Sequence, residues 1–177
     1  MMSDLVVDSS AVVALLLATG RDVKRLRSLL SDRPIYVPEL LDIEVMSVVR
    51  RLNRSGELTD QQAEAVLTAL AEFPAIRVTH RALLPHAWSL RANVSAYDAS
   101  YVALAMRLSA TLVTADARLA RAVGGEVSVG LICDASTCGI LGGRQNAAVV
   151  GRGFHEPAFL NRRTIDECFG KILPFSV

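Results

Sequence analysis

The sequence predicts an α/β fold, a three-layer α/β/α sandwich in which helices cover both faces of a short-stranded, mostly parallel five-stranded sheet. Short apolar segments alternate with helical patterns as far as about residue 132, and this alternation is typical of a parallel sheet covered by helices. The 177 residues are 51% hydrophobic with a formal net charge of +1. A chain so apolar and so nearly neutral is not disordered, and its length suits one domain with a single core.

The strands are predicted from short runs of apolar residues, which are typical of buried strands. The first run ends at an acid, Asp8, and the second ends at Pro38, which cannot donate a hydrogen bond to a sheet. The five predicted strands are residues 4–8, 35–38, 76–79, 111–114 and 127–132.

The helices are predicted from apolar residues spaced three and four apart. Thr59 suits the N-cap of one helix, and Pro85 suits the first turn of another. The predicted helices are residues 10–18, 21–31, 39–54, 60–72, 82–92, 97–108 and 117–123.

Residues 1–132 are expected to form the domain, and residues 133–177 an atypical C-terminal extension. The alternation stops after residue 132, and only a short helix near 164–171 is suggested beyond it. All three cysteines, at positions 133, 138 and 168, lie in the extension. They are odd in number and lack the spacing of a zinc site, so we expect reduced thiols rather than a disulfide scaffold.

No membrane span is expected. The longest uncharged apolar run near the start, residues 11–18, is far shorter than the roughly 20 residues that a spanning helix needs. Asp4 and Asp8 precede this run, and acids have the wrong sign for the start of a signal peptide. These observations predict a cytoplasmic protein.

Four acids occupy positions where active sites form in parallel sheets, beyond the carboxyl ends of the strands. Asp8 ends the first strand, Asp116 follows the fourth, Asp98 opens the helix over 97–108, and Glu44 lies in the helix over 39–54. Each has an alternative role in the structure. Asp8 suits a turn, and Asp98 and Asp116 suit ordinary helix N-caps.

Glu44 is harder to explain as a purely structural residue. At 100° per residue it falls on the border of an apolar stripe formed by Leu41, Val45, Val48 and Leu52. A carboxylate at such a border is desolvated, which costs free energy unless a cation or a donor compensates. Because the other acids are expected to converge nearby, a cation is favoured.

Clustered carboxylates repel one another and cannot all ionise cheaply. A bound Mg²⁺ or Mn²⁺ resolves this repulsion, because hard cations take carboxylate oxygens and water as ligands. Such an ion activates water and neutralises phosphate charge. The four acids therefore point to metal-assisted hydrolysis of phosphodiester bonds.

The residues around these acids resemble the PIN domain, specifically its VapC toxin branch. The resemblance rests on residues 5–16 (LVVDSSAVVALL), the Glu44 helix, Tyr97-Asp98-Ala99 and Thr114-Ala115-Asp116. Successive acids are 36, 54 and 18 positions apart, in the order and spacing of that family. The resemblance covers about residues 3–132.

The resemblance implies an Mg²⁺-dependent endoribonuclease, the toxin of a toxin–antitoxin pair. Asp8 and Asp98 would be the principal metal ligands, Glu44 and Asp116 would complete the site, and the hydroxyls of Ser10 and Thr114 would orient the acids. Cleavage of tRNA or rRNA would leave a 5′-phosphate and a 3′-hydroxyl. The partners would be a second copy of the chain, in a homodimer, and a small VapB-like antitoxin whose tail covers the site.

Candidate RNA-binding residues lie near these acids. Arg51 and Arg54 continue along the border that Glu44 occupies, and Arg51 is about 10 Å further along the helix axis. A solvated arginine face is the alternative. Tyr97 suits stacking on a base, whereas the spacing of Trp88 from Leu84 predicts a core position.

Two other function classes also place an acid directly after the first strand. A haloacid-dehalogenase-like phosphatase needs a second acid where Ser10 stands, and a lysine where none occurs between residues 25 and 170, so we reject it. A catalytically silent PIN-like module that binds RNA or protein is the remaining alternative. It is distinguished from an enzyme by the absence of Mg²⁺-dependent cleavage.

Overall fold

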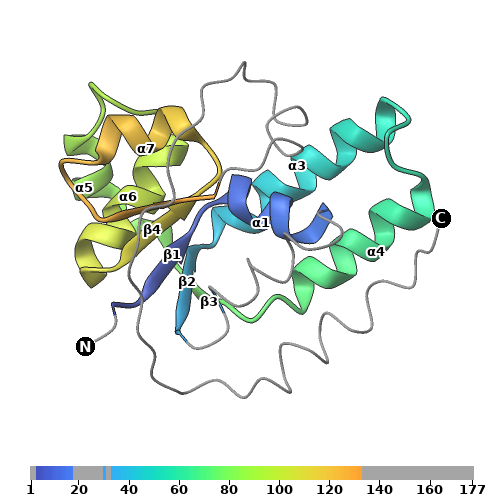
Figure 1. Ribbon diagram of the computed structural model, residues 1–177, viewed down its shortest axis with the longest axis horizontal. Coiled ribbons are helices and arrows are strands. Elements are labelled where there is room, and N and C mark those ends of the chain that lie inside the picture. Colours follow the sequence, from blue (N-terminus) through green and yellow to red (C-terminus); the bar gives the residue numbers. More distant parts are fainter. Residues whose placement is uncertain (1–2, 18–29, 31–32, 133–177) are drawn as a thin grey trace.

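The computed structural model describes residues 3–17, 30 and 33–132, which contain one five-stranded sheet (Figure 1). All four strand pairs are parallel, which confirms the predicted fold class. The predicted helix over 21–31 lies outside the described residues except for Leu30, and the extension from residue 133 lies wholly outside them. The strands are β1 (Leu5–Val7), β2 (Ile35–Pro38), β3 (Ile76–Val78), β4 (Thr111–Thr114) and β5 (Val129–Leu131), in the order β3-β2-β1-β4-β5.

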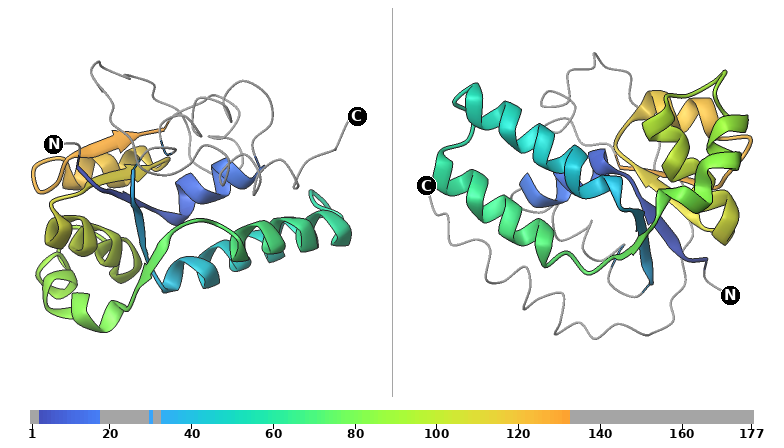
Figure 2. Two further views of the ribbon diagram at one scale, coloured as in Figure 1. Left: turned by 90° about the horizontal axis from the view of Figure 1, so that it is seen from below. Right: turned by 180° about the vertical axis from the view of Figure 1, so that it is seen from behind.

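Helices cover both faces of this sheet and form the outer two layers (Figures 1 and 2). On one side lie α1 (Ser9–Leu17), α3 (Leu40–Arg54) and α4 (Asp60–Ala71). On the other lie α5 (Leu84–Ser89), α6 (Ala96–Leu108) and α7 (Ala117–Val123). No helix among the described residues is long and apolar enough to cross a membrane.

The order of the strands determines where a site forms. From β1 the chain moves outward to β2 and β3, and then returns to add β4 and β5 on the opposite side of β1. The direction of winding therefore reverses between β1 and β4. In open parallel sheets, ligands bind beyond the carboxyl ends of the strands at such a reversal.

The core is built around β1, the central strand. Leu5, Val6 and Val7 are 2% exposed or less, because helices cover β1 on both faces. The apolar stripe of α3 differs from the prediction in one position: Val49 is buried and Val48 is only half-buried. The stripe rotates slightly because α3 packs against both α1 and α4.

Two predicted helix starts are confirmed, and one helix is shorter than predicted. Thr59 caps α4 through a capping box with Gln62, each side chain accepting from the other residue's backbone N–H. Pro85 lies in the first turn of α5. The helix predicted over 82–92 is instead a 3₁₀ turn, η1 (His80–Leu83), followed by α5. Pro85 has no N–H to bond back into η1, so a new helix begins there.

Candidate active site

Asp8 is the most enclosed of the four acids. It follows the buried strand β1 and is itself only 4% exposed. Its Oδ1 accepts from the Ser10 hydroxyl at 2.7 Å and from the Ala11 N–H at 2.9 Å. Its Oδ2 accepts from the Thr114 hydroxyl at 2.6 Å. The Ala11 bond also caps the start of α1, so the turn that the sequence suggested is present together with a carboxylate that accepts three hydrogen bonds.

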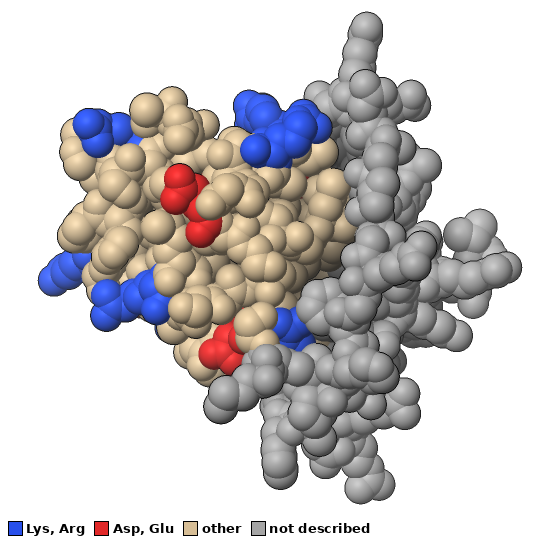
Figure 3. Space-filling model, turned by 60° about the vertical axis from the view of Figure 1, so that its left-hand side comes forward, with Lys and Arg blue, Asp and Glu red and all other residues tan. Residues whose placement is uncertain are grey.

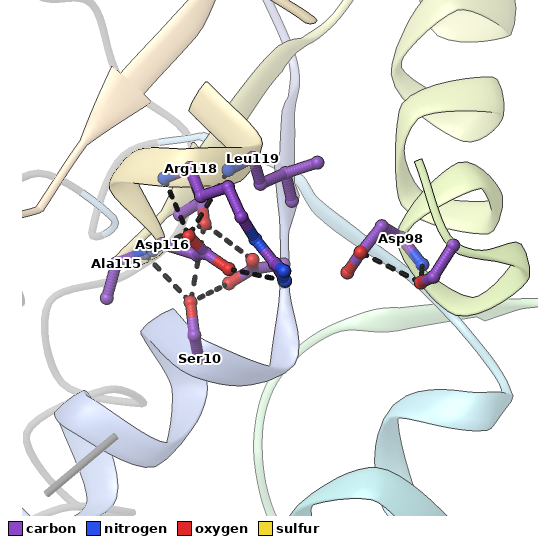
Figure 4. A network of polar contacts seen from close by, with 9 residues as sticks. Ser10, Asp98, Ala115, Asp116, Arg118 and Leu119 are labelled. Carbon is purple, nitrogen blue, oxygen red and sulfur yellow. Dashed lines mark hydrogen bonds and ion pairs between the residues drawn. The ribbon is translucent and has the colours of Figure 1, made fainter. Parts of the chain in front are cut away.

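The same two hydroxyls connect Asp8 to the segment that carries Asp116. The Thr114 hydroxyl accepts from the backbone N–H of Asp116 at 2.9 Å, and the Ser10 hydroxyl accepts from that of Ala115 at 2.9 Å. The two hydroxyl oxygens are 3.3 Å apart. Ser10 and Thr114 therefore hold the ends of β1 and β4 together, and Figure 4 shows this network from close by.

Asp116 is the N-cap of α7, as the structural alternative proposed. Its Oδ1 accepts from the N–H groups of Arg118 and Leu119 at 2.7 and 3.2 Å. Its Oδ2 lies 3.6 Å from the Arg118 guanidinium, whose side chain is 81% exposed and reaches back across Asp116 (Figure 4). Capping occupies one oxygen, so it does not prevent the other from taking a second role.

Glu44 lies on α3 and is half-buried, at the border position that the helical periodicity predicted. Its Oε2 accepts a 2.6 Å hydrogen bond from the hydroxyl of Tyr101 on α6. Burial raises the pKa of Glu44, hydrogen bonds from Tyr101 and Ser9 oppose that rise, and the charge of Asp98 adds to it. Hydroxyl donors therefore compensate part of the desolvation of Glu44.

Asp98 lies in the first turn of α6, but it is not the N-cap that the alternative suggested. Ser95 is the cap: its hydroxyl accepts from the Asp98 N–H at 3.2 Å and donates to Asp98 Oδ2 at 2.8 Å. The helix begins at Ala96, so Asp98 falls inside its first turn. Its side chain points toward the group around Asp116 (Figure 4).

The negative charge of Asp98 acts on the carboxylates of Asp8 and Glu44. Burial and, to a smaller extent, the charge of Asp98 raise the pKa of Asp8 from 3.8 to about 6, against the opposing effect of hydrogen bonds from Thr114, Ser10 and Ala11. The charge of Asp98 also raises the pKa of Glu44. The charge of Asp98 thus acts on two carboxylates at one edge of the sheet, and a cation placed among them relieves that repulsion.

The donor set fits a hard divalent cation. Three of the roughly four lone-pair positions of Asp8 accept hydrogen bonds, which leaves one on Oδ2. Within the described residues, no three His, Cys, Asp or Glu side chains gather closely enough to hold an ion by themselves. An ion here would therefore take water for its remaining places, as Mg²⁺ does in proteins.

Three polar residues of this region were not anticipated from the sequence: Ser9, Ser95 and Tyr101. Each contacts an acid that was anticipated. Ser9 directly follows Asp8, and Tyr101 comes three positions after Asp98, which is one turn along the same helix face. That spacing is the signal by which Tyr101 could have been found.

The candidate RNA-binding residues lie on the surface. Arg51 and Arg54 are exposed on the C-terminal half of α3, and Tyr97 is 65% exposed beside Asp98. Trp88, predicted to be in the core, is 70% exposed, because α5 is a short helix with no buried residue. The Arg91 guanidinium lies 5.1 Å from its ring centroid.

Charge is sparse on the side of the molecule that carries α5, α6 and α7. Figure 3 shows this face as mostly uncharged, with separate basic groups at its border and small acidic groups between them. The described residues form no continuous basic track on this face.

A family model and several known proteins are similar to this chain. The PIN domain family model matches residues 5–125. Ribonuclease VapC1 of Mycobacterium tuberculosis is 42% identical over 132 residues, which is 74% of this chain and 99% of that protein. Ribonuclease VapC9 of the same organism is 41% identical over 115 residues, 65% of this chain and 87% of that protein. The crystal structure of PAE2754 from Pyrobaculum aerophilum aligns with a TM-score of 0.49 at 21% identity, covering 72% of this chain and 92% of that one.

Proposed function

The chain belongs to the PIN-domain family as a VapC-type ribonuclease toxin, and on that premise we propose that its four acids hold a divalent metal ion, Mg²⁺ or Mn²⁺, for RNA hydrolysis. The observation that carries this proposal is the buried carboxylate of Asp8, tied by two hydroxyls to the segment of Asp116. Asp8 and Asp98 are the proposed principal ligands. Glu44 and Asp116 complete the site.

The protein residues have separable roles in this proposal. Ser10 and Thr114 fix the carboxylate of Asp8 from both sides, so that it cannot rotate away. Ser95 holds one oxygen of Asp98 and leaves the other without a described hydrogen bond. A divalent ion bound there lowers the pKa of a coordinated water and neutralises charge on a phosphate. The expected products carry a 5′-phosphate and a 3′-hydroxyl.

The proposed substrate is tRNA or rRNA, encountered in the cytoplasm. Arg51 lies seven residues after Glu44 on α3, which is about two helical turns along nearly the same face. We propose that Arg51 and Arg54 contact backbone phosphates and that Tyr97 stacks on a base. A VapB-like antitoxin and a homodimer are the proposed partners, by analogy with relatives named as VapC ribonucleases.

The proposal is tested by inducing the chain alone and mapping new 5′-phosphate RNA ends. We expect growth arrest with one dominant set of ends, and loss of both with Asp98→Asn. The purified chain should cut the same RNA with Mg²⁺ or Mn²⁺ and not in EDTA. A silent binding module would give no new ends, and Asp8→Asn would leave its phenotype unchanged. Cleavage that persists in EDTA would overturn the metal proposal alone.

A further inference from the structure

Tyr101 connects two of the acids through one helix. Its side chain is buried, at 1% exposure, and its hydroxyl donates to Glu44 Oε2 at 2.6 Å. Asp98 precedes it by three positions on α6, so the two residues lie one turn apart on the same helix face. Helix α6 therefore carries Asp98 and also donates a hydrogen bond, through Tyr101, to Glu44. Glu44 comes from α3 on the opposite side of the sheet.

Packing alone does not explain a tyrosine at this position. A phenylalanine would fill the same buried space without the cost of desolvating a hydroxyl. The hydroxyl contacts Glu44 and Ser9, which both belong to the region of the site. A bond donated to a carboxylate is short and about twice as strong as one between neutral groups. Tyr101 therefore has two roles: its ring packs in the core, and its hydroxyl donates a hydrogen bond to Glu44.

We propose that Tyr101 is a positioning residue of the ribonuclease site: by holding Oε2 of Glu44, it fixes the orientation of the carboxylate toward the metal ion. This inference rests on the metal site proposed above. It assigns α6 two tasks, presenting one metal ligand directly and orienting another through a hydroxyl. Outer partners of this kind commonly change metal affinity or activity 10- to 100-fold when they are removed.

The test compares Tyr101→Phe with wild type in the full chain. Calorimetric titration with Mn²⁺ should show an affinity about 10-fold lower, and kcat should fall about as far while KM for RNA stays nearly constant. Tyr36→Phe is the matched control, because Tyr36 on β2 is half-buried and has no described polar partner for its hydroxyl. This control should bind Mn²⁺ as wild type does.

A double-mutant cycle with Glu44→Gln shows whether Tyr101 acts through Glu44. In that background, Tyr101→Phe should change Mn²⁺ affinity no further. All variants are compared at a temperature where circular dichroism shows them folded. Equal Mn²⁺ affinity of Tyr101→Phe and wild type would overturn the inference, and so would an undiminished effect in the Glu44→Gln background. If wild type itself binds no Mn²⁺, the metal site fails, and this inference fails with it.

Discussion

The hydroxyl of Thr114 donates a 2.6 Å hydrogen bond to Asp8, a residue 106 positions earlier in the chain. The register of the sheet explains the contact. Val7 on β1 pairs with Val113 on β4, so the next residues along the two strands, Asp8 and Thr114, emerge side by side. The same hydroxyl accepts from the N–H of Asp116. One buried oxygen thus joins two of the proposed metal ligands.

Removing that oxygen should damage both stability and catalysis. Thr114→Val keeps the shape of the side chain but leaves Asp8 Oδ2 and the Asp116 N–H without a partner. We expect the free energy of unfolding to fall by about 1–3 kcal/mol, with a loss of RNA cleavage beyond the loss of folded protein. Urea unfolding and single-turnover cleavage measure the two effects.

Thr114→Ser is the matched variant, because it keeps the hydroxyl and loses only a methyl group. It should retain most of the activity, with a stability loss limited to the small cavity. If the Val and Ser variants cleave RNA equally well, the hydroxyl has no part in organising the site.

Asp8 should make the metal-free protein less stable at neutral pH than at acidic pH. Its pKa is raised from 3.8 to about 6 in the folded protein, so folding favours the protonated form. The stabilising contribution is complete below pH 3.8 and is lost as pH rises through about 6. The ionised carboxylate then costs up to about 3 kcal/mol. Asp8→Asn should therefore be more stable than wild type in EDTA at pH 8, and lose this advantage near pH 4.

Divalent ions should reverse that difference. Adding Mg²⁺ at pH 8 should raise the melting temperature of wild type and leave Asp8→Asn unchanged. Glu72→Gln is the control for a lost carboxylate, since Glu72 is exposed, and it should follow wild type throughout. A stability difference between Asp8→Asn and wild type that is the same at pH 4 and pH 8 would contradict this prediction.

The three arginines of α3 should differ in their effect on RNA binding. Arg51 and Arg54 continue along the face of Glu44, and Arg50, which is also exposed, projects from another face. Arg51→Ala and Arg54→Ala should weaken RNA binding more than Arg50→Ala does. Each of the two should also reduce the slope of log binding constant against log salt concentration by about one, which corresponds to one lost phosphate contact. Binding of a catalytically inactive background, Asp98→Asn, measured over a salt series, checks this. Equal losses from all three would indicate a solvated arginine face.

Arg77 should contribute to stability without contributing to catalysis. From β3 it donates to both oxygens of Asp42 on α3, at 2.9 and 3.2 Å. It also donates to three carbonyls at the end of α4 and in the loop after it, those of Leu70, Phe73 and Ala75.

Lysine cannot reproduce the planar fork of arginine, so we expect Arg77→Lys to lose about 2 kcal/mol of stability. Asp42→Asn keeps the carbonyl contacts and should lose less. Cleavage per folded molecule should match wild type in both variants. A larger loss from Asp42→Asn than from Arg77→Lys would show that the ion pair outweighs the carbonyl contacts.

The sequence was sufficient to predict the sheet and the elements on which the four acids lie, because both depend on local patterns. The role of these acids as metal ligands stays a prediction. Strands β1 and β4 carry apolar residues at consecutive positions, which indicates that both of their faces are covered. These residues, Val6 and Val7 on β1 and Leu112 and Val113 on β4, are all buried. Trp88 could not be placed, because its helical spacing is the same whether the helix packs on the core or lies outside it. The partnership of Tyr101 with Glu44 depends on how α6 and α3 pack, which no local pattern records.

The strand order also determines when the site can first exist. Asp8 is made early and Asp116 late, and their meeting requires β4 to enter the sheet beside β1, after the chain has completed β2 and β3. Pairing between segments so distant in the chain is slow and forms late in folding. A nascent chain therefore cannot bring Asp8 and Asp116 together until β4 has been made and has entered the sheet.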